Sequence, residues 1–324
     1  MLSKIREIRA GGKVIEKTPL LVPSFSSKGF WDIRQVYNEV QPLIDRPILV
    51  SAYDIFYEKI DRPDDPAGLI ILDSGGYEAS KDADLSDYGD YSPNPQEWNE
   101  ELFAKVISSW DIPEPTVFVS YDHPDRRVTF GEQITDALGA LPGDQNSARE
   151  ILLKPESEGQ RFLDIGALLK HVESLAGFDL LGVTEKELGG NTAERMRNIA
   201  ALRRGLDSIG CEIPIHIFGS LDTFNTVLYF LSGADVFDGL TWLRFSFFEG
   251  HTLYKHVHAS RNYGLEISVD ELDPACWFDN YQYLRQLERS MRKYTGSGEF
   301  SEFEWNAEEL DRAYKHVVEN KGGM

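Results

Sequence analysis

Short apolar runs alternate along most of the chain with longer segments whose apolar residues recur at helical spacing. Segments such as 193–208 and 222–232 predict helices between strands. Buried parallel strands are nearly continuous apolar runs, and eight of them separated by helices favour an α/β fold of the (β/α)8 TIM-barrel type over an open sheet. The eight predicted strands are 20–25, 47–53, 68–72, 116–122, 151–154, 180–184, 213–219 and 234–238.

The alternation ends after Arg244. We therefore expect a barrel core over residues 1–245 and closing helices with a C-terminal helical appendage over 246–324. Segment 82–98 is rich in Asp, Tyr, Ser, Pro and Gly, which predicts a long loop over the barrel mouth after the third strand.

The composition is that of a globular protein, with 41% apolar and 12% aromatic residues among 324. No stretch approaches the roughly 18 apolar residues that span a bilayer, and the first residues lack the apolar core of a signal peptide. We therefore expect a cytoplasmic protein without membrane contact. The two cysteines, Cys211 and Cys276, are too few for a disulfide framework or a four-ligand zinc site. Both are expected to be reduced, with Cys211 near the core.

The formal net charge of −21 argues against broad, nonspecific nucleic-acid binding, which depends on clustered Lys and Arg. A local basic patch is still compatible with this charge. Candidate patches are 126–127, 203–204 and 285–293, although a solvated helix face is the alternative for the last.

The sequence Asp-Ser-Gly-Gly-Tyr at 73–77 follows the third predicted strand directly. In a barrel of parallel strands, the loops after the strands build the active site. Gly75 and Gly76 allow a flat ligand to approach the main chain, Tyr77 offers a stacking face, and Asp73 can accept from a ring N–H or act as a base. An ordinary turn is the alternative interpretation of this motif alone.

A second carboxylate, Asp238, ends the eighth predicted strand. The ends of the third and eighth strands both border the central cavity, so Asp73 and Asp238 can converge there. Paired carboxylates suit glycosidic chemistry, in which one attacks or stabilises the anomeric carbon and the other moves a proton. A third acid, Asp122, ends the fourth strand, and any one of the three could instead cap a helix or pair with Arg244.

Seven short motifs follow one another in a recognisable order. They are TPLLVP at 18–23, SAYDI at 51–55, DSGGY at 73–77, YDHP at 121–124, GV at 182–183 with ERM at 194–196, HIFG at 216–219, and DVFD at 235–238 with an arginine at 244. In this order they resemble the tRNA-guanine transglycosylase family (queuine and archaeosine tRNA-ribosyltransferases), including its relatives that insert 7-deazaguanines into DNA. The resemblance covers roughly residues 18–290.

The resemblance implies a role for each matching residue. Asp238 would be the covalent nucleophile that attacks C1′ of the target nucleoside as guanine departs, and Asp73 would handle the proton of the leaving and incoming bases. Asp235 is a rival nucleophile, for which a structural role is favoured. The target nucleotide would be flipped into the barrel mouth. The implied base-binding residues are Asp122, which would hold the purine-like edge, Tyr77, which would stack on the ring, Gly75, Gly76 and Gly219, while Arg244 would contact phosphate or sugar.

Three departures from the family pattern concern the base pocket. Lys-Pro-Glu-Ser at 154–157 replaces Gln-Gly-Gly after the fifth strand, Thr-Glu at 184–185 replaces Gly-Gly after the sixth, and Glu78 replaces Gln. These departures favour a ligand other than guanine, preQ1 or queuine. Glu185 is the candidate contact for a cationic or amine-bearing substituent, with an outward-pointing loop charge as the alternative.

The segment of this chain that corresponds to the family's structural zinc site also departs from the family pattern. Segment 273–287 resembles the tail of the cysteine-rich segment, yet only Cys276 remains, and Glu271 and Asp273 stand where cysteines are expected. We predict no metal and no cofactor. Three neighbouring histidines are expected on the surface or in loops: His251, His256 and His258.

The favoured hypothesis is a base-exchanging pentosyltransferase that acts on guanine in a polynucleotide, either DNA or tRNA, with nucleic acid and a purine-like base as partners. One alternative is a hydrolase of a small 7-deazapurine nucleoside, which the acidic composition favours. Another is a non-catalytic partner subunit of a transglycosylase, although such a subunit would have no need of both acids. Because members of the family often form dimers, the resemblance also implies a homodimer or a complex with a partner protein.

Overall fold

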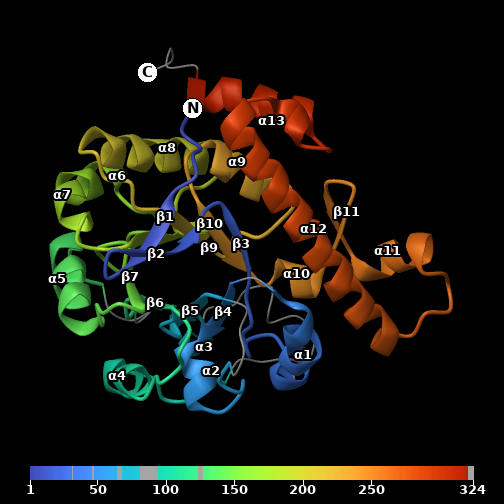
Figure 1. Ribbon diagram of the computed structural model, residues 1–324, viewed down its shortest axis with the longest axis horizontal. Coiled ribbons are helices and arrows are strands. Elements are labelled where there is room, and N and C mark those ends of the chain that lie inside the picture. The colour runs from blue at the N-terminus through green and yellow to red at the C-terminus, as the bar shows by residue number, and fades with distance from the viewer. Residues whose placement is uncertain (31, 46, 64–67, 81–93, 123–126, 320–324) are drawn as a thin grey trace.

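A sheet of eight parallel strands forms the centre of the computed structural model, which describes residues 1–30, 32–45, 47–63, 68–80, 94–122 and 127–319 (Figure 1). The strand order is β3-β10-β9-β8-β7-β6-β5-β4, and a parallel bridge between Ser24 and Leu49 joins the two outer strands. The sheet is thus nearly closed, which confirms the predicted (β/α)8 barrel. Its strands are β3 (Leu20–Pro23), β4 (Ile48–Ser51), β5 (Ile70–Asp73), β6 (Thr116–Val119), β7 (Ser147–Leu153), β8 (Leu180–Thr184), β9 (Ile215–Phe218) and β10 (Val236–Gly239).

Side chains alternate between the inside of the barrel and the helix-facing outside, as the two-residue period of a strand requires. The inner apolar cluster contains Leu20, Val22, Leu49, Ile71, Val117, Val119, Leu152, Leu180 and Val236. The hairpin β1 (Glu7–Ala10) and β2 (Lys13–Lys17) contributes the fully buried Ile8 and Ala10 to this cluster. Apolar side chains therefore fill much of the barrel interior, and in a barrel of this type the functional polar groups are expected at the C-terminal mouth.

Helices surround the barrel, as Figure 1 shows for α4, α5, α7 and α8. Helix α5 begins with a capping box between Thr129 and Glu132. Helix α9 begins later than the sequence predicts, after a turn in which Asp222 accepts hydrogen bonds from the backbone N–H groups of Phe224 and Asn225. These helices are α1 (Ile33–Val40), α2 (Ala52–Phe56), α3 (Gly76–Ala79), α4 (Glu100–Ser108), α5 (Phe130–Ala140), α6 (Ile165–Leu168), α7 (Val172–Leu175), α8 (Thr192–Ser208), α9 (Asn225–Leu231) and α10 (Thr241–Arg244).

The C-terminal helical region packs directly on the barrel. Its longest helix, α12 (Val269–Ser297), reaches strand β3 through Glu288, whose carboxylate accepts from Leu21 N at 3.3 Å. The region also holds β11 (Ser246–Phe248), β12 (His251–Leu253), α11 (Lys255–Asn262) and α13 (Ala307–Tyr314). Short 3-10 or π turns lie at Gln41–Leu43, Leu169–His171, Glu185–Glu187, Phe300–Glu302 and Lys315–Glu319. Within the described residues, no helix has the length and apolar character required to span a bilayer.

Asp235, the rival nucleophile of the sequence analysis, lies at the opposite end of β10 from Asp238 and is fully buried. Its carboxylate binds Arg6 at 2.7 Å and Arg203 at 2.8 Å, and it accepts from Ile215 N at 2.8 Å. This buried network joins the N-terminal segment, α8 and β9 at the bottom of the barrel. Asp235 therefore has a structural position, away from the mouth.

We expect Asp235→Ala to lower the free energy of unfolding by about 3–5 kcal/mol, because it leaves two buried guanidinium groups without their shared carboxylate. Urea denaturation measures the change. Asp311→Ala is the control, since Asp311 pairs with Lys315 on the surface and its loss is expected to cost less than about 1 kcal/mol. Equal costs for the two variants would contradict a structural role for Asp235.

Candidate active site

Asp238 lies at the C-terminal end of β10, and both of its carboxylate oxygens have partners. Ser24 Oγ donates to Oδ2 at 2.8 Å, and Gly219 N donates to Oδ1 at 3.2 Å. His216 Nε2 lies 3.2 Å from Oδ1. Gly219 has a φ of +77° with no atom near the position of an added Cβ, so glycine is suited to presenting its N–H here. Asp238 is thus held by two hydrogen-bond donors and lies within ion-pair distance of His216.

His216 lies between two carboxylates inside the barrel. Its Nδ1 is 2.8 Å from Glu150 Oε1, and both side chains are fully buried. Burial alone lowers the pKa of His216, but Glu150 and Asp238 outweigh this effect and raise the pKa to about 9. The ring of Phe218 packs against the imidazole ring, with 3.9 Å between the two ring centroids. At neutral pH this site therefore contains an imidazolium ion directly behind Asp238.

Sequence reasoning did not identify Glu150 or a role for His216. The fifth strand was predicted to begin at residue 151, whereas β7 begins at Ser147 and places Glu150 on its inward face. A charged residue in phase with the inward-facing Ala148 and Leu152 is the signal that would have revealed it.

Asp73 ends β5 at the same mouth and accepts a hydrogen bond from Gly75 N at 3.2 Å. Burial raises the pKa of Asp73 well above its usual range, and the charges of Asp122, Glu78 and Asp238 raise it further. The two acids predicted from sequence therefore face a shared interior, in which the surroundings of Asp73 favour its protonated form.

Two more buried acids lie behind Asp73. Glu78 accepts from Ser26 Oγ, and burial followed by the charge of Asp54 raises the pKa of Glu78 to about 8. Asp54 accepts from Ser27 N at 2.7 Å, and burial raises its pKa to about 6. Glu78 therefore carries a proton at neutral pH, which makes it a neutral hydrogen-bonding group, as a glutamine would be.

Gly75 and Gly76 lie so close to neighbouring residues of the protein that neither position has room for a side chain. A Cβ on Gly75 would lie 2.6 Å from Cβ of Tyr53, and one on Gly76 would lie 2.4 Å from the carbonyl oxygen of Asp122. Gly75 also has a φ of +89°. The glycine pair thus lets the loop pack tightly against its neighbours, so its presence is explained without a ligand.

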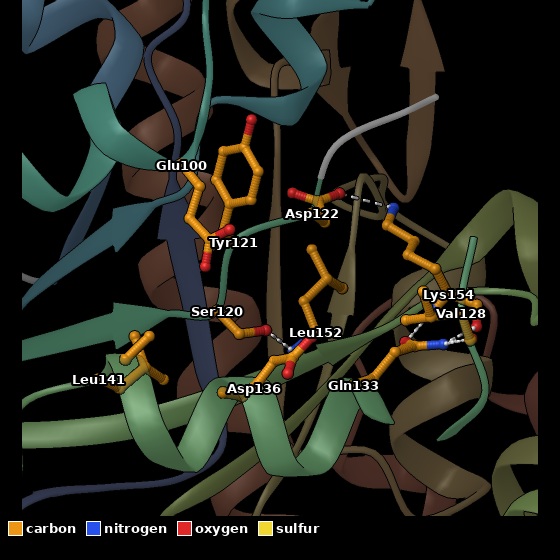
Figure 2. Close-up of a pocket in the computed structure, with 12 residues that line it drawn as sticks. Glu100, Ser120, Tyr121, Asp122, Val128, Gln133, Asp136, Leu141, Leu152 and Lys154 are labelled. Carbon is orange, nitrogen blue, oxygen red and sulfur yellow. Dashed lines mark hydrogen bonds and ion pairs between the residues drawn. The ribbon is translucent and has the colours of Figure 1, made fainter. Parts of the chain in front are cut away.

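Asp122 is paired with Lys154 at the ends of β6 and β7 (Figure 2). Lys154 Nζ lies 3.2 Å from Asp122 and 3.4 Å from Glu187, while Ser74 Oγ donates to Asp122. Gln133 of α5 binds both the N–H and the C=O of Lys154, each at 2.9 Å. Lys154 is therefore placed against Asp122, the acid that the resemblance implies would hold the base.

The pocket drawn in Figure 2 has a volume of about 60 Å³. Asp122, Lys154 and Gln133 are among the residues that line it. A cavity of this volume has room for water, which needs at least about 10–15 Å³ of such space.

Glu185 is bound by groups of the protein itself. Its carboxylate accepts from Arg195 at 2.5 Å and from the Tyr229 hydroxyl at 2.8 Å. At the other side of the mouth, Arg244 Nη2 donates to the hydroxyl of Tyr77 at 3.3 Å. The structure thus brings Tyr77 and Arg244 together and directs Glu185 toward α8 and α9.

Part of the predicted mouth lies outside the described residues. This holds for 82–93 of the expected loop, for His123 and Pro124 of the YDHP motif, and for Arg126. The described end of that loop is anchored, because Trp98 Nε1 donates to the carbonyl of Ser74 at 2.9 Å.

Cys211 and Cys276 are both buried free thiols, and Cys276 accepts from Ser246 Oγ at 3.0 Å. Over the described part of the chain, no cluster of three or more His, Cys, Asp or Glu side chains is arranged to hold a metal.

His251 and His256 are exposed as expected, but the surface prediction is wrong for His258, which is buried between the rings of Phe248 and Tyr263.

No protein-family model and no curated protein matches this chain. The resemblance to transglycosylases consequently depends on the sequence motifs alone.

We expect Glu78→Gln to raise the free energy of unfolding at about pH 8.5 by on the order of 2–4 kcal/mol and to change it little at about pH 4.5. Folded Glu78 keeps its proton up to about pH 8, whereas the unfolded chain releases it near 4.5. The stability conferred by the proton is present below the unfolded pKa and is lost as pH rises through the folded pKa. Urea denaturation at both pH values measures this difference.

The control for this prediction is Glu101→Gln on the exposed surface of α4. It should change stability by less than about 0.5 kcal/mol at either pH. A Glu78→Gln effect of the same size at both pH values would contradict the raised pKa.

Proposed function

We propose that the protein is a transglycosylase-like enzyme that exchanges guanine for a 7-deazaguanine-type base in a polynucleotide, DNA or tRNA, through a covalent bond between Asp238 and the sugar. The observation that carries this proposal is the contrast between two acids at one barrel mouth. Asp238 has two hydrogen-bond donors and the His216 imidazolium beside it, whereas Asp73 is buried among other acids, and this burial raises its pKa. Glycosidic exchange requires one carboxylate that attacks the anomeric carbon and one carboxyl that donates a proton.

In the first half of the proposed reaction, an Asp238 oxygen forms a bond to C1′ while the bond between C1′ and the base nitrogen breaks. The electron pair of that bond leaves with the base, and Asp73 gives its proton to the departing heterocycle. In the second half, the incoming base returns a proton to Asp73 as its nitrogen attacks C1′ and releases Asp238. The sugar-phosphate chain stays intact throughout.

Recognition of the base is assigned to the other side of the mouth. Asp122 can accept from the N–H groups of a guanine-like edge, and Lys154 beside it limits the charge that Asp122 presents. Because Lys154 has a third N–H beyond its two carboxylate partners, it also offers a donor to an acceptor on the base. The presence of Lys154 where the resemblance implies a glutamine supports a base other than guanine itself as the incoming ligand. Tyr77 and Arg244 are the proposed contacts to the flipped nucleotide.

A second candidate is hydrolysis of a small 7-deazapurine nucleoside, with water in place of the incoming base. The net charge of −21 favours it, because a polyanion gains little from an acidic protein. The same acids would act in the same order, so the two functions differ only in substrate and acceptor.

We expect the wild-type protein to incorporate labelled 7-deazaguanine base into duplex DNA or tRNA. Release of base from a free nucleoside without incorporation would instead indicate the hydrolase. Absence of both reactions would indicate a non-catalytic partner subunit.

Asp238→Asn should reduce incorporation by at least about 10³-fold because it removes the nucleophile, and Asp73→Asn should reduce it by about 10²–10⁴-fold because it removes the proton donor. Asp311→Asn on the surface is the matched control and should leave the rate unchanged. Circular dichroism verifies folding of each variant. Full activity of a folded Asp238→Asn protein would contradict the assignment of the nucleophile.

A further inference from the structure

Glu150, His216 and Asp238 form a continuous line of buried charges from the middle of the barrel to its mouth. They come from three strands, β7, β9 and β10, and the two contacts measure 2.8 Å and 3.2 Å. Glu150 and His216 have no exposed surface and cannot reach the substrate directly. Their chemistry must therefore act through Asp238.

Both ring nitrogens of His216 face a carboxylate oxygen. A neutral imidazole has one N–H and one bare nitrogen, so it would turn a lone pair toward one of these oxygens. Only the imidazolium presents a positive charge to both oxygens, at 2.8 Å and 3.2 Å, and the raised pKa of His216 agrees with this arrangement. Ser24 and Gly219, the other partners of Asp238, are neutral donors. His216 is thus the sole cation in contact with Asp238 within the described residues.

We propose that Glu150 and His216 are a positioning pair whose imidazolium holds Asp238 and stabilises the carboxylate that Asp238 regains when the covalent sugar intermediate breaks down. This inference rests on the proposed function. When Asp238 bonds to C1′, its negative charge is consumed, and Glu150 becomes the remaining counter-ion of His216. When the bond between C1′ and the Asp238 oxygen breaks, the electron pair returns to that oxygen beside Nε2–H. The His216 proton stays on the ring in both steps.

The need for Glu150 follows from the middle of this cycle. Without its charge, the esterified enzyme would hold an uncompensated buried cation, and His216 would release its proton. A neutral His216 would then stabilise the leaving carboxylate less, because charge-assisted hydrogen bonds are about twice as strong as neutral ones. Glu150 therefore keeps the imidazolium charged at the stage when Asp238 cannot.

The test uses Glu150→Gln, which keeps the acceptor for Nδ1–H but removes the charge. The His216 titration is followed by NMR of the imidazole-labelled full-length protein. We expect a midpoint near pH 9 in the wild type and one displaced toward about 6.5 in the variant. The surface variant Glu101→Gln should titrate like the wild type. A wild-type His216 that is neutral at about pH 7, or a midpoint that Glu150→Gln leaves unchanged, would overturn the inference.

Rapid-quench single turnovers then separate formation of the denaturation-stable adduct between protein and polynucleotide from its breakdown on adding base. In Glu150→Gln we expect breakdown to slow by about 10- to 100-fold at about pH 8, with accumulation of the adduct, and by less at about pH 6, where His216 regains its proton. His216→Gln, which keeps a neutral N–H, should slow breakdown equally at both pH values. Breakdown at the wild-type rate in both folded variants would overturn the inference.

The two readouts separate this inference from the function on which it rests. A wild-type protein that forms no adduct with DNA or tRNA would refute the proposed function and the assigned catalytic step together. The NMR titration would still decide whether Glu150 maintains a buried imidazolium. An adduct that forms and turns over with a neutral His216 would leave the function standing and remove the positioning pair.

Discussion

The burial of charged side chains inside a nearly closed barrel is the constraint on which this site depends. An ionised group that leaves water needs a counter-charge or donors, or it exchanges its proton and becomes neutral. Both solutions occur here in adjacent zones. Glu150 and Asp238 share the His216 cation, and Asp122 and Glu187 share Lys154. The zone around Asp73, Glu78 and Asp54 has hydrogen-bond donors of hydroxyl and backbone groups instead, and there the pKa of every acid is raised. The barrel interior thus separates proton-holding acids from paired carboxylates.

The sequence predicted the barrel well, because a buried strand leaves a local trace in its own residues. All eight strands form where apolar runs predicted them, and Asp73, Asp122 and Asp238 lie at or just beyond strand ends because chain direction fixes which end a residue occupies. Partner choice was not predictable in the same way. The pairing of Glu150 with His216 joins residues 66 positions apart, and its recognition also required the correct start of β7. The pattern of residues along one strand does not specify which side chain of a distant strand will contact it.

Glu185 and Glu187 illustrate how small a local difference decides such a contact. Both lie in one 3-10 turn, Glu185–Glu187, in which each residue advances by about a third of a turn. Two positions along this turn rotate the side chain by roughly two thirds of a circle. Glu185 accordingly binds Arg195 and Tyr229 on the helix side, while Glu187 lies 3.4 Å from Lys154 inside the mouth. The sequence singled out Glu185 after the sixth strand, but the turn geometry determines that Glu187 is the one that reaches Lys154.

The acidic composition gives an incomplete picture of the charge that a substrate meets. The formal value of −21 counts every Asp and Glu as ionised. Glu78 holds a proton at neutral pH, and burial favours the protonated form of Asp73. His216 adds a positive charge that the formal value omits, and Lys154 is placed against Asp122. The mouth of the barrel is therefore less negative than a count of its side chains suggests. Because potentials at short range depend on these nearby groups more than on screened charges beyond about 10 Å, an acidic protein can still present a mouth that a phosphate-bearing chain can approach.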